Sequence, residues 1–316
     1  MTMFRLLMML FLGMSGLSSA YAGCSSSSSS SSFGSISSFT LASTAQTVES
    51  GSGFTCSGSL LSLISTNTVT ATISSTSNAS GSTPQLYNAS TGEYIPYAIC
   101  KDSGCSATYP IGDTIKWSST TLLGLLGLFN SSDGTLPIYL RTSTGANVAA
   151  GTYTDNITLS WYYKICFVGV LGICAYTTGT DTSVVPVSMV VTNDCYIDSA
   201  PDVNFGTQAL PSSFSTISNA LSVRCTRNAT YTVGLSSLNA GSGNWRQMNA
   251  LINGSTYSLQ YQFYRSDGTV WTSENHYGAT GTGDSQNISY TAKINPNQSN
   301  VPAGAYSDTV TVTVTY

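Results

Sequence analysis

Charge is scarce in this 316-residue chain, because Asp, Glu, Lys and Arg together make up 8% of it and the formal net charge is −4. Basic runs are missing, so we do not expect nucleic acid as a partner. The single histidine, His276, lies in the polar stretch WTSENHYG. Because histidine is the most frequent side chain in proton-transfer catalysis, we expect no catalytic residue and no enzyme.

Apolar runs long enough to cross a bilayer as a helix are also missing. The apolar stretch at 6–12 follows Arg5 and precedes the sequence Ala-Tyr-Ala at 20–22. A short positive region, an apolar stretch and a small-x-small site are typical of a secretory signal peptide. We therefore expect residues 1–22 to be removed and the mature chain to begin at Gly23.

Eight cysteines follow, and an even number in an exported chain indicates disulfides. We expect no metal and no cofactor, because bridged cysteines are not available as ligands. Lipidation at Cys24 is an alternative, but it would leave an odd thiol, and Tyr21 fits a lipoprotein cleavage site poorly. The order suggests four sequential bridges: Cys24–Cys56, Cys100–Cys105, Cys166–Cys174 and Cys195–Cys225.

The chain is rich in Ser, Thr, Gly, Tyr and Val, which is typical of strands joined by turns. One pattern occurs twice, as AGTYTDNITLSWYY at 150–163 and AGAYSDTVTVTVTY at 303–316. Apolar residues alternate with Ser and Thr in both copies, which indicates a half-buried strand. Asp155 and Asp308 occupy matching positions, and we expect both to accept hydrogen bonds from nearby backbone.

Other segments repeat in the same order. The first and last cysteine pairs have similar spacing, and YAICKDSG (97–104) aligns with YQFYRSDG (261–268). No segment outside the leader has a convincing helical period. We therefore expect an all-β protein with two β-sandwich domains, at 23–193 and 194–316.

The two copies differ after the repeated strand. In the first, an apolar loop at 164–182 leads to another strand, SVVPVSMVVT at 183–192, whereas none follows the second copy in the given sequence. We expect the second sandwich to lack its last strand and to accept one from another chain. With only Gly23 ahead of Cys24, the chain is expected to donate no strand and so to end a polymer. The open groove is expected along Val310, Val312, Val314 and Tyr316.

These features resemble the spore coat protein U domain family and, within it, two-domain tip adhesins of Csu-type archaic chaperone–usher pili. NDCYID, NFGTQ, LSVRCTRNATYTVGLS and VPAGAYSDTVTVTVTY carry the resemblance over residues 193–316. It implies immunoglobulin-like, pilin-type sandwiches, a periplasmic chaperone, an outer-membrane usher and an adjacent pilin subunit that donates a strand. It also implies secretion through the periplasm to a pilus tip at the cell surface, where the chain would attach to surfaces and promote biofilm formation.

Two apolar segments are candidates for contact with hydrophobic or host surfaces. The first, in KICFVGVLGICAY, has two glycines that suggest a turning loop. Since the strand at 183–192 leads into the second domain, this loop is expected at the opposite pole, roughly 30 Å away at ~3.3 Å per residue. The second segment is TTLLGLLGLFN at 120–130. The expected contact residues are Phe167, Val168, Val170, Leu171 and Ile173 in the first segment and Leu122, Leu123, Leu125, Leu126, Leu128 and Phe129 in the second.

Both segments could instead be buried in the core, because an apolar run is compatible with either location. A short disulfide beside the first segment favours a rigid projection, and an exposed apolar patch would favour contact. The alternative function is a lectin-like or protein-receptor-binding fimbrial adhesin with a polar pocket. Trp117 and Trp161 are its candidate sugar-binding side chains, although Trp161 also fits a core position in a strand.

Overall fold

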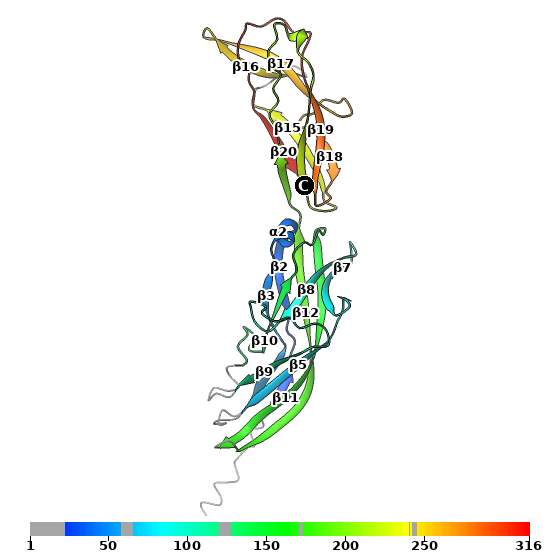
Figure 1. Ribbon diagram of the computed structural model, residues 1–316, viewed down its shortest axis with the longest axis vertical. Helices are drawn as coiled ribbons and strands as arrows, with labels where there is room; N and C mark the ends of the chain where they lie inside the picture. The colour runs from blue at the N-terminus through cyan, green and yellow to red at the C-terminus, as the bar shows by residue number, and fades with distance from the viewer. Residues whose placement is uncertain (1–22, 58–65, 120–127, 171–172, 240, 242–244) are drawn as a thin grey trace, which may run out of the picture.

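The computed structural model describes residues 23–57, 66–119, 128–170, 173–239, 241 and 245–316. For Ser57, Ser119, 167–170 and Ile173 only the backbone is described. The expected signal peptide lies outside these residues. In the described part the regular secondary structure is almost all β-strand, in two sheet-rich domains placed end to end, as the sequence predicts (Figure 1).

The N-terminal domain contains the strands β1 to β12 and one short helix. Their bounds are β1 Gly23–Ser26, β2 Ser31–Ser37, α2 Ser38–Ser43, β3 Thr47–Gly51, β4 Phe54–Ser57, β5 Asn67–Thr76, β6 Ala79–Ser80, β7 Thr83–Asn88, β8 Glu93–Cys100, β9 Thr114–Ser119, β10 Pro137–Thr142, β11 Gly151–Val170 and β12 Ile173–Thr192.

Two layers form this domain, in the orders β3-β10-β8-β7 and β9-β5-β11-β12-β2. A single backbone pair, Thr154 with Tyr87, joins β11 to β7 and so links the layers. The core between the layers is built from alternating apolar side chains, including Ile73, Ile99 and Leu159, none of which is exposed. Period-two alternation along each strand therefore places one face of each layer in the core.

The C-terminal domain repeats this arrangement with fewer strands. Its bounds are β13 Cys195–Ser199, η1 Pro211–Ser213, β14 Ile217–Cys225, β15 Thr230–Ser237, β16 Arg246–Ile252, β17 Ser255–Arg265, β18 Tyr277–Thr280, β19 Ser285–Ile294 and β20 Val310–Thr315. The layers have the orders β13-β14-β19-β17-β16 and β18-β15-β20. A second core, which includes Trp271, Tyr231 and Val233, lies between them.

The helix α2 differs from the expectation of no helix outside the leader. It has six residues, and the Ser37 hydroxyl accepts a hydrogen bond from the backbone N–H of Thr40 at its start. A helix of this length is too short to produce a periodic sequence pattern. Within the described residues, no helix has the length and apolar character needed to cross a membrane.

The four disulfides join the cysteines in sequence order, which confirms the suggested pairing: Cys24–Cys56, Cys100–Cys105, Cys166–Cys174 and Cys195–Cys225. No free cysteine remains in the described chain. In both domains one bridge connects two neighbouring antiparallel strands directly opposite each other, β1 with β4 and β13 with β14. These bridges hold the first strand of each repeat against its sandwich.

Side chains from both domains meet where the domains join. The Arg224 guanidinium lies over the ring of Phe39 at 5.2 Å and over that of Tyr196 at 5.6 Å. Arg227 forms an ion pair of 3.1 Å with Glu93. Phe39 belongs to α2, so this helix packs at the joint. No sequence pattern pointed to these contacts, because they depend on how the domains are placed.

Candidate functional site

The strand β20 has a neighbour on one side only. It pairs with β15, and no strand of the described chain pairs along its other edge. In the N-terminal domain the matching strand, β11, pairs with β5 on one side and with β12 on the other. β12 runs antiparallel to β11 and parallel to β2, so it fills the space between them. The C-terminal domain has no such strand among its described residues.

Side chains of the repeated strand are less buried in the second domain, where no described strand lies along the free edge of β20. Four apolar positions on β11 are at most 2% exposed, whereas the matching positions in the second domain are only half-buried. The matched pairs are Tyr153 with Tyr306, Ile157 with Val310, Leu159 with Val312, and Trp161 with Val314. Apolar surface that β12 covers in the first domain therefore remains accessible in the second.

A groove of about 400 Å³ lies along this accessible surface, and we call it the β20 groove. Val310 and Val312 line it from β20, and the segment 200–203 with Phe205 lines its opposite side. Its floor includes Tyr261, Phe263 and Tyr290 from the other layer. Val314 packs against the core outside the groove lining, and Tyr316 lies beyond β20 with 56% exposure. The groove is thus lined mainly by apolar and aromatic side chains, with Asp202 and Asp308 among its polar members, and it is bordered by an unpaired strand edge.

The N-terminal domain indicates the energy that such a strand supplies. Four alternating β12 side chains, Val185, Val187, Met189 and Val191, are at most 1% exposed. Burial of each contributes about 1.5–3 kcal/mol, or about 6–12 kcal/mol for four, before the entropy of ordering the strand is subtracted. This is comparable to the whole stability of an ordinary domain, about 5–15 kcal/mol.

The opposite pole of the molecule carries a projecting hairpin formed by the ends of β11 and β12 (Figure 1). Pairing of β11 with β5 ends at Lys164, so beyond it β11 pairs with β12 alone. We call this part, residues 165–177, the distal hairpin. The expectation of a loop at 164–182 is wrong, because strand pairing continues from Tyr163 opposite Gly179 to Val170 opposite Ile173. Gly169 and Gly172 had suggested a loop, but Gly169 lies within β11 and pairs with Cys174.

The base of the distal hairpin is fixed by two contacts. The Cys166–Cys174 disulfide joins its strands, with 5.8 Å between the Cα atoms. The backbone N–H of Cys166 donates a 2.7 Å hydrogen bond to Oδ1 of Asn67, a buried side chain. An isolated two-stranded hairpin is marginally stable in water, so these contacts stabilise it where the sheet no longer does.

The described residues include only part of the expected contact surface. Only the backbone of Phe167, Val168, Val170 and Ile173 is described, and it forms the distal hairpin. Leu128 and Phe129 are half-buried and pack against the N-terminal core. Five other expected contact residues lie outside the described residues: Leu122, Leu123, Leu125, Leu126 and Leu171.

Neither tryptophan proposed for a sugar site is accessible. Trp117 is 4% exposed and Trp161 is 2% exposed, and the Trp161 indole donates a hydrogen bond to the Ser183 hydroxyl at 2.9 Å. Trp161 also stacks on Phe54, with 4.4 Å between the ring centroids. The core alternative is therefore correct for Trp161, and the sugar-site expectation for this pair is wrong.

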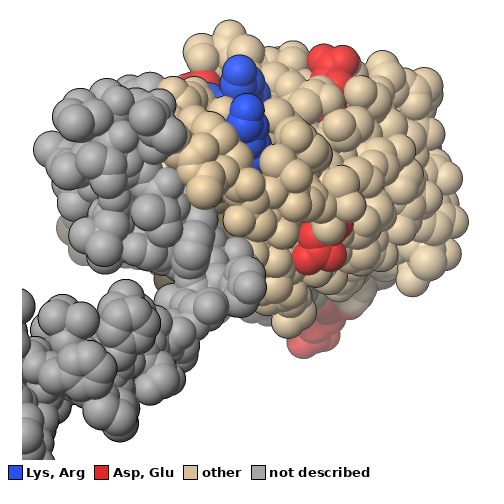
Figure 2. Space-filling model, turned by 90° about the horizontal axis from the view of Figure 1, so that it is seen from below, with Lys and Arg blue, Asp and Glu red and all other residues tan. Residues whose placement is uncertain are grey.

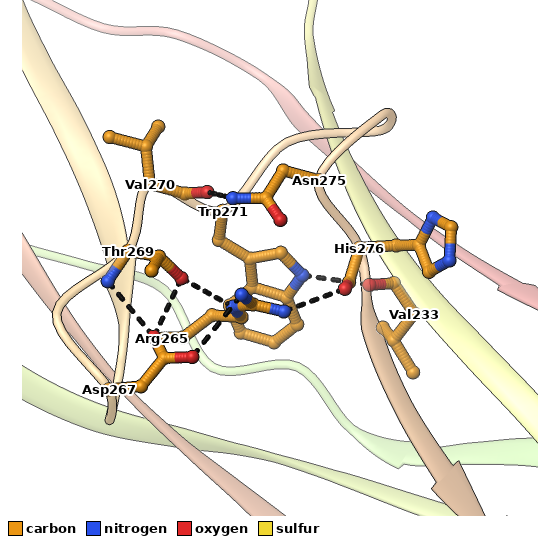
Figure 3. Close-up of polar contacts among 8 residues, drawn as sticks. All are labelled: Val233, Arg265, Asp267, Thr269, Val270, Trp271, Asn275 and His276. Carbon is orange, nitrogen blue, oxygen red and sulfur yellow. Dashed lines mark hydrogen bonds and ion pairs between the residues drawn. The ribbon is translucent and has the colours of Figure 1, made fainter.

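His276 lies in a loop that is held by other residues. Arg265 donates a 2.8 Å hydrogen bond to the backbone carbonyl of His276 and forms an ion pair with Asp267. The imidazole is exposed and points away from this cluster (Figure 3). Trp271 fixes the loop from inside, since its indole N–H donates to the carbonyl of Val233 at 2.7 Å. The arrangement orders a loop, and none of the hydrogen bonds or ion pairs among the described residues involves the imidazole.

Comparison with solved structures finds a similarity that extends over nearly the whole chain. A chain of the CsuC–CsuE chaperone–tip adhesion subunit pre-assembly complex, from archaic chaperone–usher Csu pili of Acinetobacter baumannii, is 28% identical. The alignment covers 93% of this chain and 100% of that one, with a TM-score of 0.61. This neighbour is an assembly of an adhesion subunit and a chaperone, and its fold agrees with the pilin-type sandwiches expected from the sequence.

Two more distant structures are also tip or adhesive subunits. The CupB6 tip adhesin of Pseudomonas aeruginosa is 12% identical over 93% of this chain and 94% of its own, with a TM-score of 0.34. CfaE, the adhesive subunit of CFA/I fimbria of enterotoxigenic Escherichia coli, is 10% identical over 92% of this chain and 98% of its own, with a TM-score of 0.31. No curated protein sequence matches the chain.

The sequence profile of the Spore Coat Protein U domain matches residues 14–160 and 181–313. The two matches fall one in each half of the chain, in agreement with the internal repeat. The stretch between them, 161–180, contains the distal hairpin. With both matches together covering most of the sequence, the chain belongs to the Spore Coat Protein U domain family.

Proposed function

We propose that this chain is a pilus tip adhesin, which attaches cells to surfaces and promotes biofilm formation through its apolar distal hairpin. A strand donated by the adjacent pilin subunit joins its second domain to the fibre. A periplasmic chaperone holds that domain before assembly, and an outer-membrane usher secretes the chain to the cell surface. The similarity to the Csu chaperone–tip adhesion subunit complex supports the chaperone and the tip position.

The observation that carries the proposal is the accessible surface along β20. Val310 and Val312 are half-buried beside the β20 groove, whereas their counterparts Ile157 and Leu159 are fully buried under β12. The groove has the unpaired edge and the apolar lining that strand addition requires. By analogy with β12, the donated strand runs antiparallel to β20 and presents apolar side chains at every second residue.

The test is to supply the strand from the chain itself. A second copy of residues 182–192 is fused after Tyr316 through a flexible linker, and the mature protein is expressed without a chaperone. The fusion is expected to be a soluble, cooperatively folded monomer, whereas the unfused chain aggregates. A matched fusion, in which the copies of Val185, Val187 and Met189 are replaced by Asp, should behave like the unfused chain. If the unfused chain is already a stable monomer, the second domain needs no donor and this part of the proposal is wrong.

The distal hairpin supports the adhesive half of the proposal by its position and its composition. It lies at the pole opposite the β20 groove, where a surface would first meet the end of a fibre (Figure 1). Its segment FVGVLGI contains no polar side chain. Exposed apolar groups contact hydrophobic surfaces without a specific receptor. A lectin-like function has less support, because Trp117 and Trp161 are buried.

A further inference from the structure

The outer face of the layer next to the distal hairpin has an unusual composition. This face consists of the outward positions of β9, β5, β11 and β12, and we call it the tip face. Backbone pairing aligns Lys116, Thr70 and Tyr162 in one row across the first three strands. A second row contains Ser118, Thr68 and Lys164. The remaining outward positions near the hairpin are hydroxyl or aromatic: Thr114, Thr72, Ser160, Thr178, Thr180, Thr182 and Tyr176.

Positive charge is concentrated here in a chain that has very little charge. Of its four lysines, Lys116 and Lys164 are exposed on the tip face, Lys101 is exposed beside it after the end of β8, and Lys293 is in the other domain. The Lys101 ammonium donates a 2.7 Å hydrogen bond to the backbone carbonyl of Lys116, which holds these two lysines together. Seen from the distal pole, Lys and Arg atoms gather in one area of a surface that also carries separate Asp and Glu side chains (Figure 2).

The carboxylates of these strands do not neutralise the lysines. Asp155 on β11 is buried, and Asp181 on β12 lies opposite the core residue Trp161 and accepts a hydrogen bond from the backbone N–H of Ser26. β5 and β9 contain no acidic residue. Asp102, next to Lys101, accepts hydrogen bonds from Ser106. The three ammonium groups therefore lack a carboxylate partner among the described contacts.

Two tyrosines complete the tip face. Tyr162 is 48% exposed and Tyr176 is 41% exposed. The Lys164 ammonium lies 4.5 Å from the centre of the Tyr176 ring, so part of the charge is positioned over a flat aromatic surface. Tyrosines offer both an apolar ring face and a hydroxyl, and the threonines between them offer donors and acceptors.

We propose that the tip face binds anionic polysaccharides. Lys101, Lys116 and Lys164 pair with sulfate or carboxylate groups, while sugar rings rest on Tyr162 and hydrogen-bond to the threonine hydroxyls. The exposed face of a sheet offers a continuous surface to an extended polymer, and its rows of hydroxyl groups can bind a sugar chain as well as its anionic groups. Each exposed ion pair contributes little. Firm binding therefore requires many fibres along one polymer-coated surface. This surface is separate from the apolar residues of the distal hairpin.

The probe is dextran sulfate, with neutral dextran as the matched polymer. Binding of both to the full mature chain, purified with its periplasmic chaperone, is measured at low and at physiological ionic strength. We expect binding to dextran sulfate alone, weakening as salt screens the charges. Lys164→Gln should weaken it roughly two- to fivefold, and K116Q/K164Q roughly four- to twentyfold, as expected for exposed ion pairs. The double variant should still be recovered with the chaperone and show unchanged thermal unfolding.

Lys293→Gln is the control, because Lys293 also lies over a tyrosine ring, that of Tyr264 at 5.3 Å, but in the other domain. It makes the same change in net charge and should leave binding unchanged. Equal losses for the Lys164 and Lys293 variants would mean that net charge alone drives binding, which overturns the proposal. Unchanged binding by K116Q/K164Q, or equal binding to neutral dextran, would also overturn it. Ser replacements at Val168, Val170 and Leu171 should not alter dextran sulfate binding, which separates this site from the adhesive hairpin.

Discussion

The Tyr97 hydroxyl donates a 2.8 Å hydrogen bond to Oδ2 of Asp155, and Tyr261 makes the equivalent bond to Asp308 in the second domain. Both aspartates also accept backbone N–H groups, Asp155 from Asn78 and Asp308 from Thr309 among others. The structural role expected for the repeated aspartates is therefore confirmed. Each fixes the start of the repeated strand to the opposite layer of its sandwich.

Tyr97→Phe should destabilise the N-terminal domain by about 1–3 kcal/mol, because a buried carboxylate loses a donor. Urea unfolding of the full chain with its fused donor strand measures the change. Tyr139→Phe is the control, since that hydroxyl also meets a carboxylate, Glu49 at 3.3 Å, but at the surface. Tyr139→Phe should lower the free energy of unfolding by less than about 0.5 kcal/mol. Equal effects of the two variants would show that the Tyr97–Asp155 bond contributes nothing beyond an exposed contact.

Burial raises the pKa of the Asp155 carboxyl above 3.8, although hydrogen bonds from Tyr97 and nearby backbone lower it. The folded domain then holds this proton more tightly than the unfolded chain does. The stability that this proton contributes is fully present below the pKa that Asp155 has in the unfolded chain. It is lost as pH rises through the higher pKa that Asp155 has in the folded domain. Asp155→Asn should flatten the fall in unfolding free energy between pH 3.8 and neutrality. Parallel pH profiles for the variant and the natural chain would contradict this assignment.

Replacing Cys166 and Cys174 by Ser should loosen the distal hairpin and leave the sandwich intact, because pairing with β5 ends at Lys164. The bridge spans 8 residues of sequence, and its loss costs the hairpin about 2–3 kcal/mol in chain-entropy terms. Hydrogen exchange should accelerate in 165–177 and remain slow in β5. Removal of the Cys100–Cys105 bridge, which joins the end of β8 to the following turn and not the two strands of the hairpin, should leave exchange in 165–177 unchanged.

Serine at Val168, Val170 and Leu171 should abolish attachment of cells to hydrophobic plastic while fibres still assemble. If five or six hairpin residues are each about half covered on contact, they contribute roughly 4–9 kcal/mol before association costs. Val184 and Val190 are exposed valines elsewhere on β12, at 46% and 42%, and their serine variants should adhere normally. Wild-type attachment by the triple variant on normal fibres would show that the hairpin is not the adhesive site.

The sequence predicted the features that depend on local pattern. The repeat identified β11 and β20, the aspartates at 155 and 308, and the segment 183–192 as an extra strand, because period-two alternation survives in each. The cysteine order gave the correct bridges. These signals arise within one strand or between matched strands, and they need no knowledge of how the layers are placed.

Features that depend on non-local pairing were not predicted. Gly169 and Gly172 suggested a loop, but pairing with the opposite strand carries β11 through to Val170. The parallel contact of β2 with β12 and the Arg224 stack on Phe39 join segments far apart in the chain. The tip face was missed for a related reason. Lys116 and Lys164 are distant in sequence, and only the registers of β9, β5 and β11 bring them together.

The central claim is that a donated strand completes the second domain along β20. The most direct measurement is hydrogen exchange of the β20 amides, Val310–Thr315, in the chain fused to its own copy of residues 182–192. The account predicts strong protection of β20 in this fusion and loss of that protection when the copies of Val185, Val187 and Met189 are replaced by Asp. β11 should remain protected in both. Equal protection of β20 in the two fusions would contradict the account.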